Sequence, residues 1–254
     1  MAGIQSVTSN YSNNIYGNIA SGNRINKASD DAAGLAINEK MKSQVSGLDQ
    51  GKANSDEGVK ALNIADGAMG QATDSLQRVY ELSVKAANTF MYGEEERKAM
   101  QDEASSLLKD IDTMAKNTTY NEQQITNGGD SIHIASNPDG SGTDIKKANI
   151  SLEALGLKDF DINSPDAISK VSEAIKNISG QRADGGAATA GLEYAKNYNS
   201  IASENTLSAS SKLADLDIPK AVSKMKQEEI LKSYQFMLQK KKQEEEEKKI
   251  LGLF

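Results

Sequence analysis

The sequence predicts a mainly α-helical protein, built as a long antiparallel helical hairpin or coiled coil with a small β-region at one end. Apolar residues recur every three or four positions over most of the chain, which is the pattern of amphipathic helices. Apolar residues make up only 37% of the chain and aromatic residues 5%, which suits narrow helical seams better than one thick core. Only three prolines occur in 254 residues, so little interrupts the helices.

A first helix is predicted near the N-terminus, where the apolar positions are Ile4, Val7, Tyr11, Ile15 and Ile19. Gly22 and the polar residues up to Lys27 loosen this pattern. Ser29, Asp30 and Asp31 together supply an N-cap and an acidic first turn, so a new helix is expected to start there. This explains the two adjacent carboxylates better than a catalytic pair does.

A heptad-like pattern follows at Leu62, Ala65, Met69, Ala72, Leu76, Val79, Leu82 and Ala86. Its alternating spacings predict a helix from about Ser43 to Ala87 that packs along another helix. The chain then breaks between Asn88 and Gly93, and the acidic run Glu94–Glu96 favours a new helix start. The apolar positions of this helix are Met100, Ala104, Leu107, Ile111 and Met114. It is short enough to fold back antiparallel on its predecessor.

Residues 117–163 contain several turn signals, and two stretches that alternate between polar and apolar residues, 131–135 and 148–152, are predicted to be small strands. Ser164 and Pro165 predict the next helix start. The apolar pattern then resumes at Ile168, Val171, Ile175 and Ile178. Gly185–Gly186 is expected to weaken this helix locally, and Pro219 to mark a kink or a restart.

The chain ends in an apolar stripe at Ile218, Val222, Met225, Ile230, Leu231, Tyr234 and Leu238. Residues 240–249 then offer lysine–glutamate pairs one helical turn apart, before the apolar segment Ile250–Phe254. A stripe of this length needs a partner that covers it. The natural partners are the N-terminal helix and further copies of the chain.

Composition excludes several classes of function. A net charge of −7 disfavours nucleic-acid binding, and without cysteine there can be neither disulfides nor thiolate metal sites. His133 is the only histidine, which excludes histidine-based metal sites and catalytic triads by count. No apolar run approaches the roughly 20 residues that cross a bilayer, and the N-terminus does not resemble a cleaved signal. We therefore expect no membrane insertion, and either a cytoplasmic location or export without a cleaved signal.

Several ordered motifs resemble those of bacterial flagellin. Its N-terminal signature is matched by Ala20–Asn26, Ser29–Ile37 and Glu39–Met41, and a following segment by Leu76–Asn88. Further similar segments are Gln101–Glu103, Asp110–Asp112, Tyr120–Asn121, Ser179–Ala183, Leu192–Glu193 and the apolar terminus Ile250–Phe254. The resemblance covers both ends and nearly all of the middle of the chain.

This resemblance implies a structural subunit of the flagellar filament, with no catalysis and no cofactor. Residues 1–42 would form the N-terminal helix and spoke of the family's D0 domain, 43–205 the D1 bundle with its β-region at about 120–163, and 206–254 the C-terminal D0 helix. The resemblance also implies that the family's variable outer domains are missing, because residues 120–164 have room only for the D1 strands. Polymerisation is assigned to Ile4, Val7, Tyr11, Ile15, Ile230, Leu231, Tyr234, Leu238, Leu251, Leu253 and Phe254.

The resemblance also implies partners and a location. Members of the family form a helical homopolymer, are exported through the flagellar type III apparatus, are held by an export chaperone on the C-terminal helix, and assemble under a cap protein. This predicts a secreted protein in the extracellular flagellum.

The D1 surface of the family is also recognised by Toll-like receptor 5, and the matching positions here are Gln77, Arg78, Glu81, Leu82 and Glu103. The chain departs from the family at Tyr80 and Leu107, where arginine is usual or common, and at Ala190–Gly191, where Asn-Arg is usual. The charged residues 240–249 replace a glutamine-rich segment.

Three alternatives stay open at this stage. A hook–filament junction protein shares the terminal helices, although it matches the N-terminal motifs less well. An enzyme is a second alternative, since some flagellins carry an inserted protease, but no metal-ligand motif is present. A generic coiled-coil scaffold is the third.

Overall fold

The computed structural model describes residues 15–251, and their side chains as far as residue 247. Its main helices are α2 (Ala32–Ala86), α3 (Glu94–Asn117), α4 (Ala167–Ala214) and α5 (Ile218–Leu251), and residues 15–21 are also helical. Strands β1 (Thr119–Tyr120) and β2 (Gln123–Gln124) form one antiparallel pair, and β3 (Ile132–Ile134) and β4 (Thr143–Ile145) form another. The predicted fold class, mainly α with a small β-region, is confirmed.

The described chain divides into two compact units. One contains the residues up to Gln44 and those from Glu204 onward, and the other contains Val45–Ser203. Helices α2 and α4 each contribute to both units. The assignment of these parts to named domains stays a prediction.

Helix α2 begins where the acidic pair lies, as predicted, but it then continues without the expected delay to Ser43. The N–H of Gly34 donates to Oδ1 of Asp31 at 2.8 Å, which makes Asp31 a helix cap. The carboxylate of Asp30 accepts the N–H groups of Asn26 and Lys27, each at 3.0 Å. Both carboxylates therefore hold the turn before α2.

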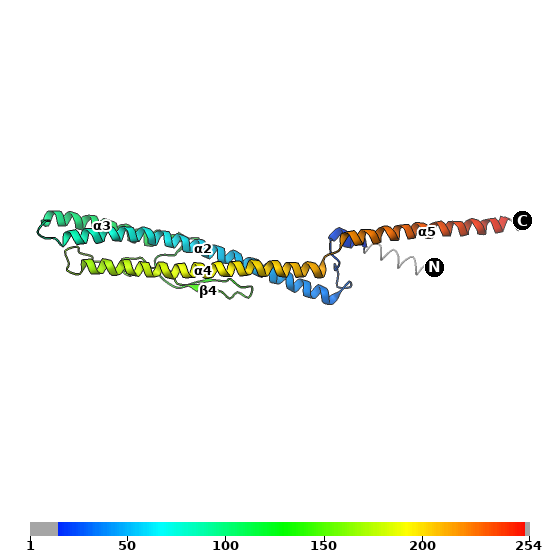
Figure 1. Cartoon of the computed structure of the whole chain (residues 1–254), viewed down its shortest axis with the longest axis horizontal. Helices are drawn as coiled ribbons and strands as arrows, with labels where there is room; N and C mark the ends of the chain where they lie inside the picture. Colours follow the sequence, from blue (N-terminus) through cyan, green and yellow to red (C-terminus); the bar gives the residue numbers. More distant parts are fainter. Residues whose placement is uncertain (1–14, 252–254) are drawn as a thin grey trace. The chain divides into compact units, whose positions relative to one another are not determined.

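The core of the 45–203 unit lies between three helices that run side by side, α2, α3 and α4 (Figure 1). The predicted heptad positions of α2 from Ala65 to Ala86 are buried in it. Leu76 and Val79 of α2, Ile111 of α3 and Ile178 of α4 are each fully inaccessible to solvent. On α3, Leu108 is buried while Leu107, the predicted seam residue, is only half-buried.

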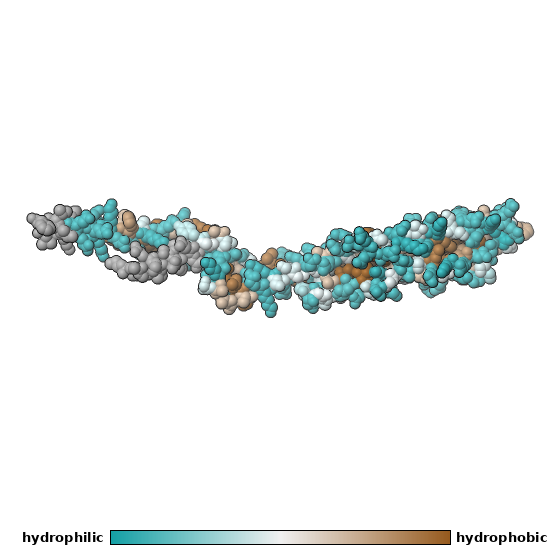
Figure 2. Space-filling model, turned by 180° about the vertical axis from the view of Figure 1, so that it is seen from behind, coloured by the Kyte–Doolittle hydropathy of each residue, from teal (hydrophilic) through white to brown (hydrophobic). Residues whose placement is uncertain are grey.

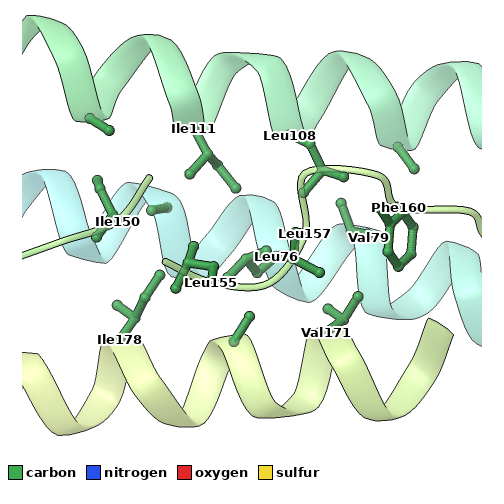
Figure 3. Close-up of a cluster of buried hydrophobic side chains, with 14 of the residues drawn as sticks. Leu76, Val79, Leu108, Ile111, Ile150, Leu155, Leu157, Phe160, Val171 and Ile178 are labelled. Carbon is green, nitrogen blue, oxygen red and sulfur yellow. The ribbon is translucent and has the colours of Figure 1, made fainter. Parts of the chain in front are cut away.

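A non-helical segment fills the space between these helices. Figure 3 shows its residues Ile150, Leu155, Leu157 and Phe160 pointing in among side chains of α2, α3 and α4. Gly156 lies in the left-handed region, with φ +70°, at the turn that brings Leu155 and Leu157 inward. The segment therefore acts as a wedge that completes the core.

The sequence prediction of a strand at 148–152 is wrong, because this part of the wedge makes only one isolated bridge, between Asn127 and Asn149. On one edge its backbone pairs with residues 126–128, since Gly128 donates to the carbonyl of Ala148 at 2.8 Å, and on the other edge a glutamine side chain stands where a strand would lie. The N–H of Asn149 donates to Oε1 of Gln181 at 2.6 Å, and Nε2 of Gln181 donates back to the carbonyl of Asn149 at 3.1 Å. The alternation of polar and apolar residues at 148–152 comes from an extended segment that buries one side. Strands show the same alternation for the same reason.

Helix α4 runs antiparallel to α2, as the order of their polar contacts shows. Arg182 pairs with Asp66 at 2.7 Å, and farther along α4 Lys196 pairs with Asp56, which lies earlier in α2. Gly185–Gly186 causes no break in α4. The predicted restart near Pro219 is confirmed, because α4 ends at Ala214 and α5 begins at Ile218.

Candidate assembly surface

The helix that ends the chain, α5, exposes most of its large apolar side chains. Four predicted polymerisation residues are exposed by 44% to 66%: Ile230, Leu231, Tyr234 and Leu238. At 100° per residue they fall on one face of the helix, together with the exposed Met237. Phe236, also exposed, lies on another face. Along α5, apolar residues reach the surface among polar ones (Figure 2).

The first turns of α5 behave differently. Val222 and Met225 are half-buried, and they lie on a different side of the helix from the exposed stripe. The predicted single stripe is therefore two stripes, of which the second is uncovered.

The helical residues 15–21 contact α5, in keeping with the expectation that the terminal helices pair. The hydroxyl of Tyr16 donates to Oε1 of Glu229 at 2.8 Å, and this hydrogen bond raises the pKa of Tyr16. Ile15 is half-buried. Ile4, Val7 and Tyr11 lie outside the described residues, as do Leu253, Phe254 and the side chain of Leu251.

The connection before α2 is held by backbone hydrogen bonds to the end of α4. The N–H of Arg24 donates to the carbonyl of Ala214 at 2.7 Å, and Leu216 donates to the carbonyl of Gly22 at 2.8 Å. The guanidinium of Arg24 also donates to the carbonyl of Leu213 at 2.7 Å. This junction fixes where α5 starts.

The charge run on α5 is helical and exposed from residue 240 to 247. The predicted pairs at one-turn spacing do not close into ion pairs among these residues. In water an exposed pair gains about 0–1 kcal/mol, too little to fix two long side chains in one geometry.

The predicted receptor-contact residues divide into four exposed side chains and one buried one. Arg78 lies at the centre: its Nε donates to Glu103 on α3 at 2.8 Å, and its Nη1 donates to Glu81 at 3.2 Å. The bond to Glu103, and then that to Glu81, raises the pKa of Arg78. Gln77 is exposed beside them, whereas Leu82 is only 2% exposed and belongs to the core. Leu82 therefore supports this surface from beneath rather than presenting its side chain on it.

Metal binding, the single histidine and membrane spanning each bear on what the described part of the chain can do. No cluster of three or more His, Cys, Asp or Glu side chains there could hold a metal ion. His133 hydrogen-bonds to Asp144 across the β3–β4 pair. None of the helices described has both the length and the apolar content that spanning a membrane requires.

A core between three packed helices, and a further helix whose apolar stripe is exposed in the described chain, are features expected of a protein that packs against other helices. Comparison with known families identifies the kind of protein. Residues 3–131 match the bacterial flagellin N-terminal helical region, and residues 168–245 match the bacterial flagellin C-terminal helical region. The chain belongs to the bacterial flagellin family.

Known relatives cover most of its length. The chain is 35% identical over 236 residues to the flagellar filament 33 kDa core protein of Treponema phagedenis, covering 84% of this chain and 82% of that protein. It is 33% identical over 255 residues to a flagellin of Bacillus subtilis, covering 84% and 83%.

Solved structures share the fold at lower identity. The crystal structure of Bacillus cereus flagellin has a TM-score of 0.51 at 22% identity, covering 58% of this chain and 88% of that one. A protein described as flagellar hook-associated, from Vibrio parahaemolyticus, has a TM-score of 0.60 at 14% identity, covering 73% and 100%. The fold is thus common to both kinds of protein, and membership of the flagellin family rests on the sequence.

Proposed function

We propose that this chain is the structural subunit of a bacterial flagellar filament and that it polymerises by burying the exposed stripe of α5 between copies. The single observation that carries this proposal is the stripe of α5 formed by Ile230, Leu231, Tyr234 and Leu238, whose side chains are exposed in the described chain. The family membership and the filament core proteins among its relatives support the same function.

Burial of the α5 stripe between copies would supply the driving force for polymerisation. Each large apolar side chain that leaves water contributes about 1.5–3 kcal/mol. Part of this gain is offset by the lost freedom of the associating subunits. The stripe is therefore unfavourable in a free subunit and favourable in a polymer, where the same surface recurs on every neighbour.

Deletion of residues 230–254 tests this proposal. The truncated chain retains the whole 45–203 unit, so we expect it to keep a helical circular dichroism spectrum and a cooperative melting transition. Negative-stain electron microscopy after salting out should show filaments from the full chain and none from the truncated one. Normal filaments from the truncated chain would contradict the proposal.

The exposed stripe of α5 also suggests why the free subunit needs a chaperone before it polymerises. We propose that an export chaperone covers α5 until the chain leaves the cell through the flagellar type III route, and that a cap protein guides its insertion. Co-purification of the full chain, but not of the 230–254 deletion, with the chaperone of the source bacterium is the expected result. Equal capture of both chains would contradict it.

For recognition by Toll-like receptor 5 we propose the α2–α3 surface of Gln77, Arg78, Glu81 and Glu103, supported from beneath by Leu82. The hydrogen-bonded arrangement around Arg78 favours this proposal, because it holds one guanidinium between two carboxylates on an exposed face. Arg78→Ala should weaken binding to the receptor ectodomain by about tenfold or more, as expected for an interface hot spot.

Lys109→Ala, an exposed change elsewhere on α3, serves as the control for the receptor experiment. Surface plasmon resonance would measure both variants. Equal affinity of Arg78→Ala and the unmodified chain would contradict the proposal. Leu82→Ala is unsuitable for this test, because it removes a core side chain.

A further inference from the structure

A pocket of about 530 Å³ lies in the 45–203 unit between α2, α4 and the β3–β4 pair. Its walls include Leu62 and Met69 of α2, Ile132 of β3 and Ile145 of β4. The volume lies within the range of about 300–1,000 Å³ that is typical of ligand pockets, so it has room for two large apolar side chains. No predicted site residue lies in it.

On the α4 side the pocket is bounded by Gly185 and Gly186. A Cβ atom added at either position would meet no atom within 4 Å, so the space is open. Glycine is the poorest helix former after proline, yet both glycines lie inside the long helix α4. Larger side chains at these positions would reach into the pocket.

The turn between α2 and α3 exposes two large apolar side chains, which is the number that the pocket has room for. Phe90 is 95% exposed and Met91 67% exposed, the most exposed pair of adjacent large apolar residues in the described chain. The turn itself is held by backbone hydrogen bonds, since the N–H groups of Met91 and Tyr92 both donate to the carbonyl of Asn88 at 3.2 Å. Aromatic and methionine side chains are enriched at the centres of protein interfaces. An ordered turn thus holds two such side chains out in water.

Charges flank the turn and the pocket with opposite signs. Glu94, Glu95 and Glu96 follow the turn and are exposed. Lys146 and Lys147 follow β4 and border the pocket, which also has Asp184 on its α4 side and, on its α2 side, Asp66 paired with Arg182. In the described part of the chain, none of these five glutamate and lysine side chains forms an ion pair. The turn and the β4 side of the pocket are therefore complementary in charge.

The turn cannot fill the pocket of its own chain. At 1.5 Å per residue, α2 separates the pocket wall at Ala65 from its own end at Ala86 by roughly 30 Å. A second copy carries the same turn, and its exposed apolar side chains and acidic run match the pocket and the lysines beside it. A contact between two different surfaces of one protein, when it does not close into a ring, produces an open row of subunits.

We propose that Phe90 and Met91 of one copy insert into the α2–α4 pocket of a second copy, so that subunits line up head to tail. Glu94–Glu96 of the first copy then lie near Lys146 and Lys147 of the second. This inference rests on the proposed function, because it assigns one contact within the polymer, separate from the α5 stripe.

Two substitutions break the contact from opposite sides. Phe90→Ser removes the inserted ring, and Gly185→Leu fills the pocket while replacing glycine by a better helix former. Both should raise the concentration needed for polymerisation by about tenfold or more, as loss of a central anchor does. Thr89→Ser controls for the turn. Gly180→Leu controls for α4, because Gly180 also has open space at its Cβ but lies outside the pocket. Thermal melts by circular dichroism should show all four variants folded.

Cross-linking tests the geometry directly. The chain has no cysteine, so every introduced thiol is unique. Thr89→Cys combined with Lys146→Cys should give a ladder of covalent oligomers when the polymer is treated with a short bismaleimide. Thr89→Cys combined with Lys109→Cys, whose second thiol lies on α3 away from the pocket, should not.

The outcomes separate this inference from the proposed function. Filaments that form normally from Phe90→Ser and Gly185→Leu, without a ladder, would overturn the inference and leave the proposed function standing. Inhibition by Gly185→Leu but not by Phe90→Ser would also overturn it, because the pocket would then hold another occupant, such as a small apolar molecule. Failure of the unmodified chain to polymerise would overturn both.

Discussion

Two helices of this chain carry apolar residues at the same spacing and differ in what covers them. On α4, Val171, Ala174 and Ile178 lie against α2, α3 and the wedge and are fully buried. On α5, Ile230 and Tyr234 occupy an equivalent stripe and are exposed by 66% and 57%. The spacing of apolar residues therefore predicts a helix and its apolar face. Whether that face is covered depends on the rest of the chain.

The difference between α4 and α5 indicates a division of labour. The α4 seam is buried within the subunit, whereas we propose that the exposed α5 stripe serves contacts between subunits. One residue type allows the two to be compared directly, because isoleucine occurs in both places, at 178 and at 230.

The largest expected effect is that of Ile178→Ala. This side chain is fully buried, and replacing a buried isoleucine by alanine typically lowers the free energy of unfolding by about 2–5 kcal/mol. Urea denaturation followed by circular dichroism would measure it. A loss below about 0.5 kcal/mol would show that the α4 seam is not the stabilising element.

Acid should weaken the link between α2 and α4. Hydrogen bonds from Lys196 and Lys60 lower the pKa of Asp56 to about 2, below its ordinary value of 3.8. The link's contribution is present above pH 3.8 and is lost as the pH falls through about 2. Asp56→Asn should therefore be less stable than the unmodified chain at pH 5 and nearly equal to it at pH 2.

Asp102→Asn is the control for the acid experiment, because Asp102 is exposed on α3 and pairs with no cation in the described chain. Thermal melts across this pH range would compare the variants. A difference between Asp56→Asn and the unmodified chain that stays constant from pH 5 to pH 2 would contradict the ionic link.

A smaller effect is expected at the β3–β4 pair. Nδ1 of His133 lies 2.7 Å from Asp144 and Nε2 lies 3.1 Å from the carbonyl of Gly140, so both ring nitrogens face acceptors. The bond to Asp144, and then that to Gly140, raises the pKa of His133 above 6.5. The stabilisation is complete below pH 6.5 and is lost as the pH rises through the raised pKa.

Because His133 is the only histidine, its NMR titration is free of overlap. Asp144→Asn should lower its pKa toward the ordinary value. An unchanged pKa in this variant would mean that Asp144 does not hold the ring.

The smallest effect on the subunit is expected from Ile230→Ala. Its side chain is mostly exposed, so the free energy of unfolding should change by no more than about 0.5 kcal/mol. Urea denaturation alongside Ile178→Ala would give the contrast in one experiment. A large loss of stability would mean that the α5 stripe is already covered in the free subunit.

The sequence predicted the helices and the α2 seam well, because spacing of three and four residues reports one helical face directly. Prediction from the sequence failed where a residue is buried by segments that are distant from it in the chain. The alternation at 148–152 was mistaken for a strand because an extended segment wedged between helices buries its side chains in the same pattern. Leu82 was assigned to an exposed surface by resemblance, although its place in the heptad, between Val79 and Ala86, indicated the core.

The pocket and the exposed turn could not be predicted in the same way. Gly185–Gly186 was visible as a weak point of a helix, but its open space depends on β3 and β4, which are distant in sequence. Phe90 gave no periodic signal, because a turn has no regular face. Such surfaces become apparent only when the helices are placed side by side.

We propose that the α5 stripe drives assembly and contributes little to the stability of the subunit. Replacing Ile230, Leu231 and Tyr234 together by serine is the test, with Gln235, Gln239 and Gln243 replaced by serine as the matched control on the opposite face of the same helix. Sedimentation of the full chain under polymerising conditions is the measurement. We expect the control to pellet like the unmodified chain and the stripe variant to stay in the supernatant, with the same melting temperature for both. Equal pelleting of the stripe variant and the control would contradict it.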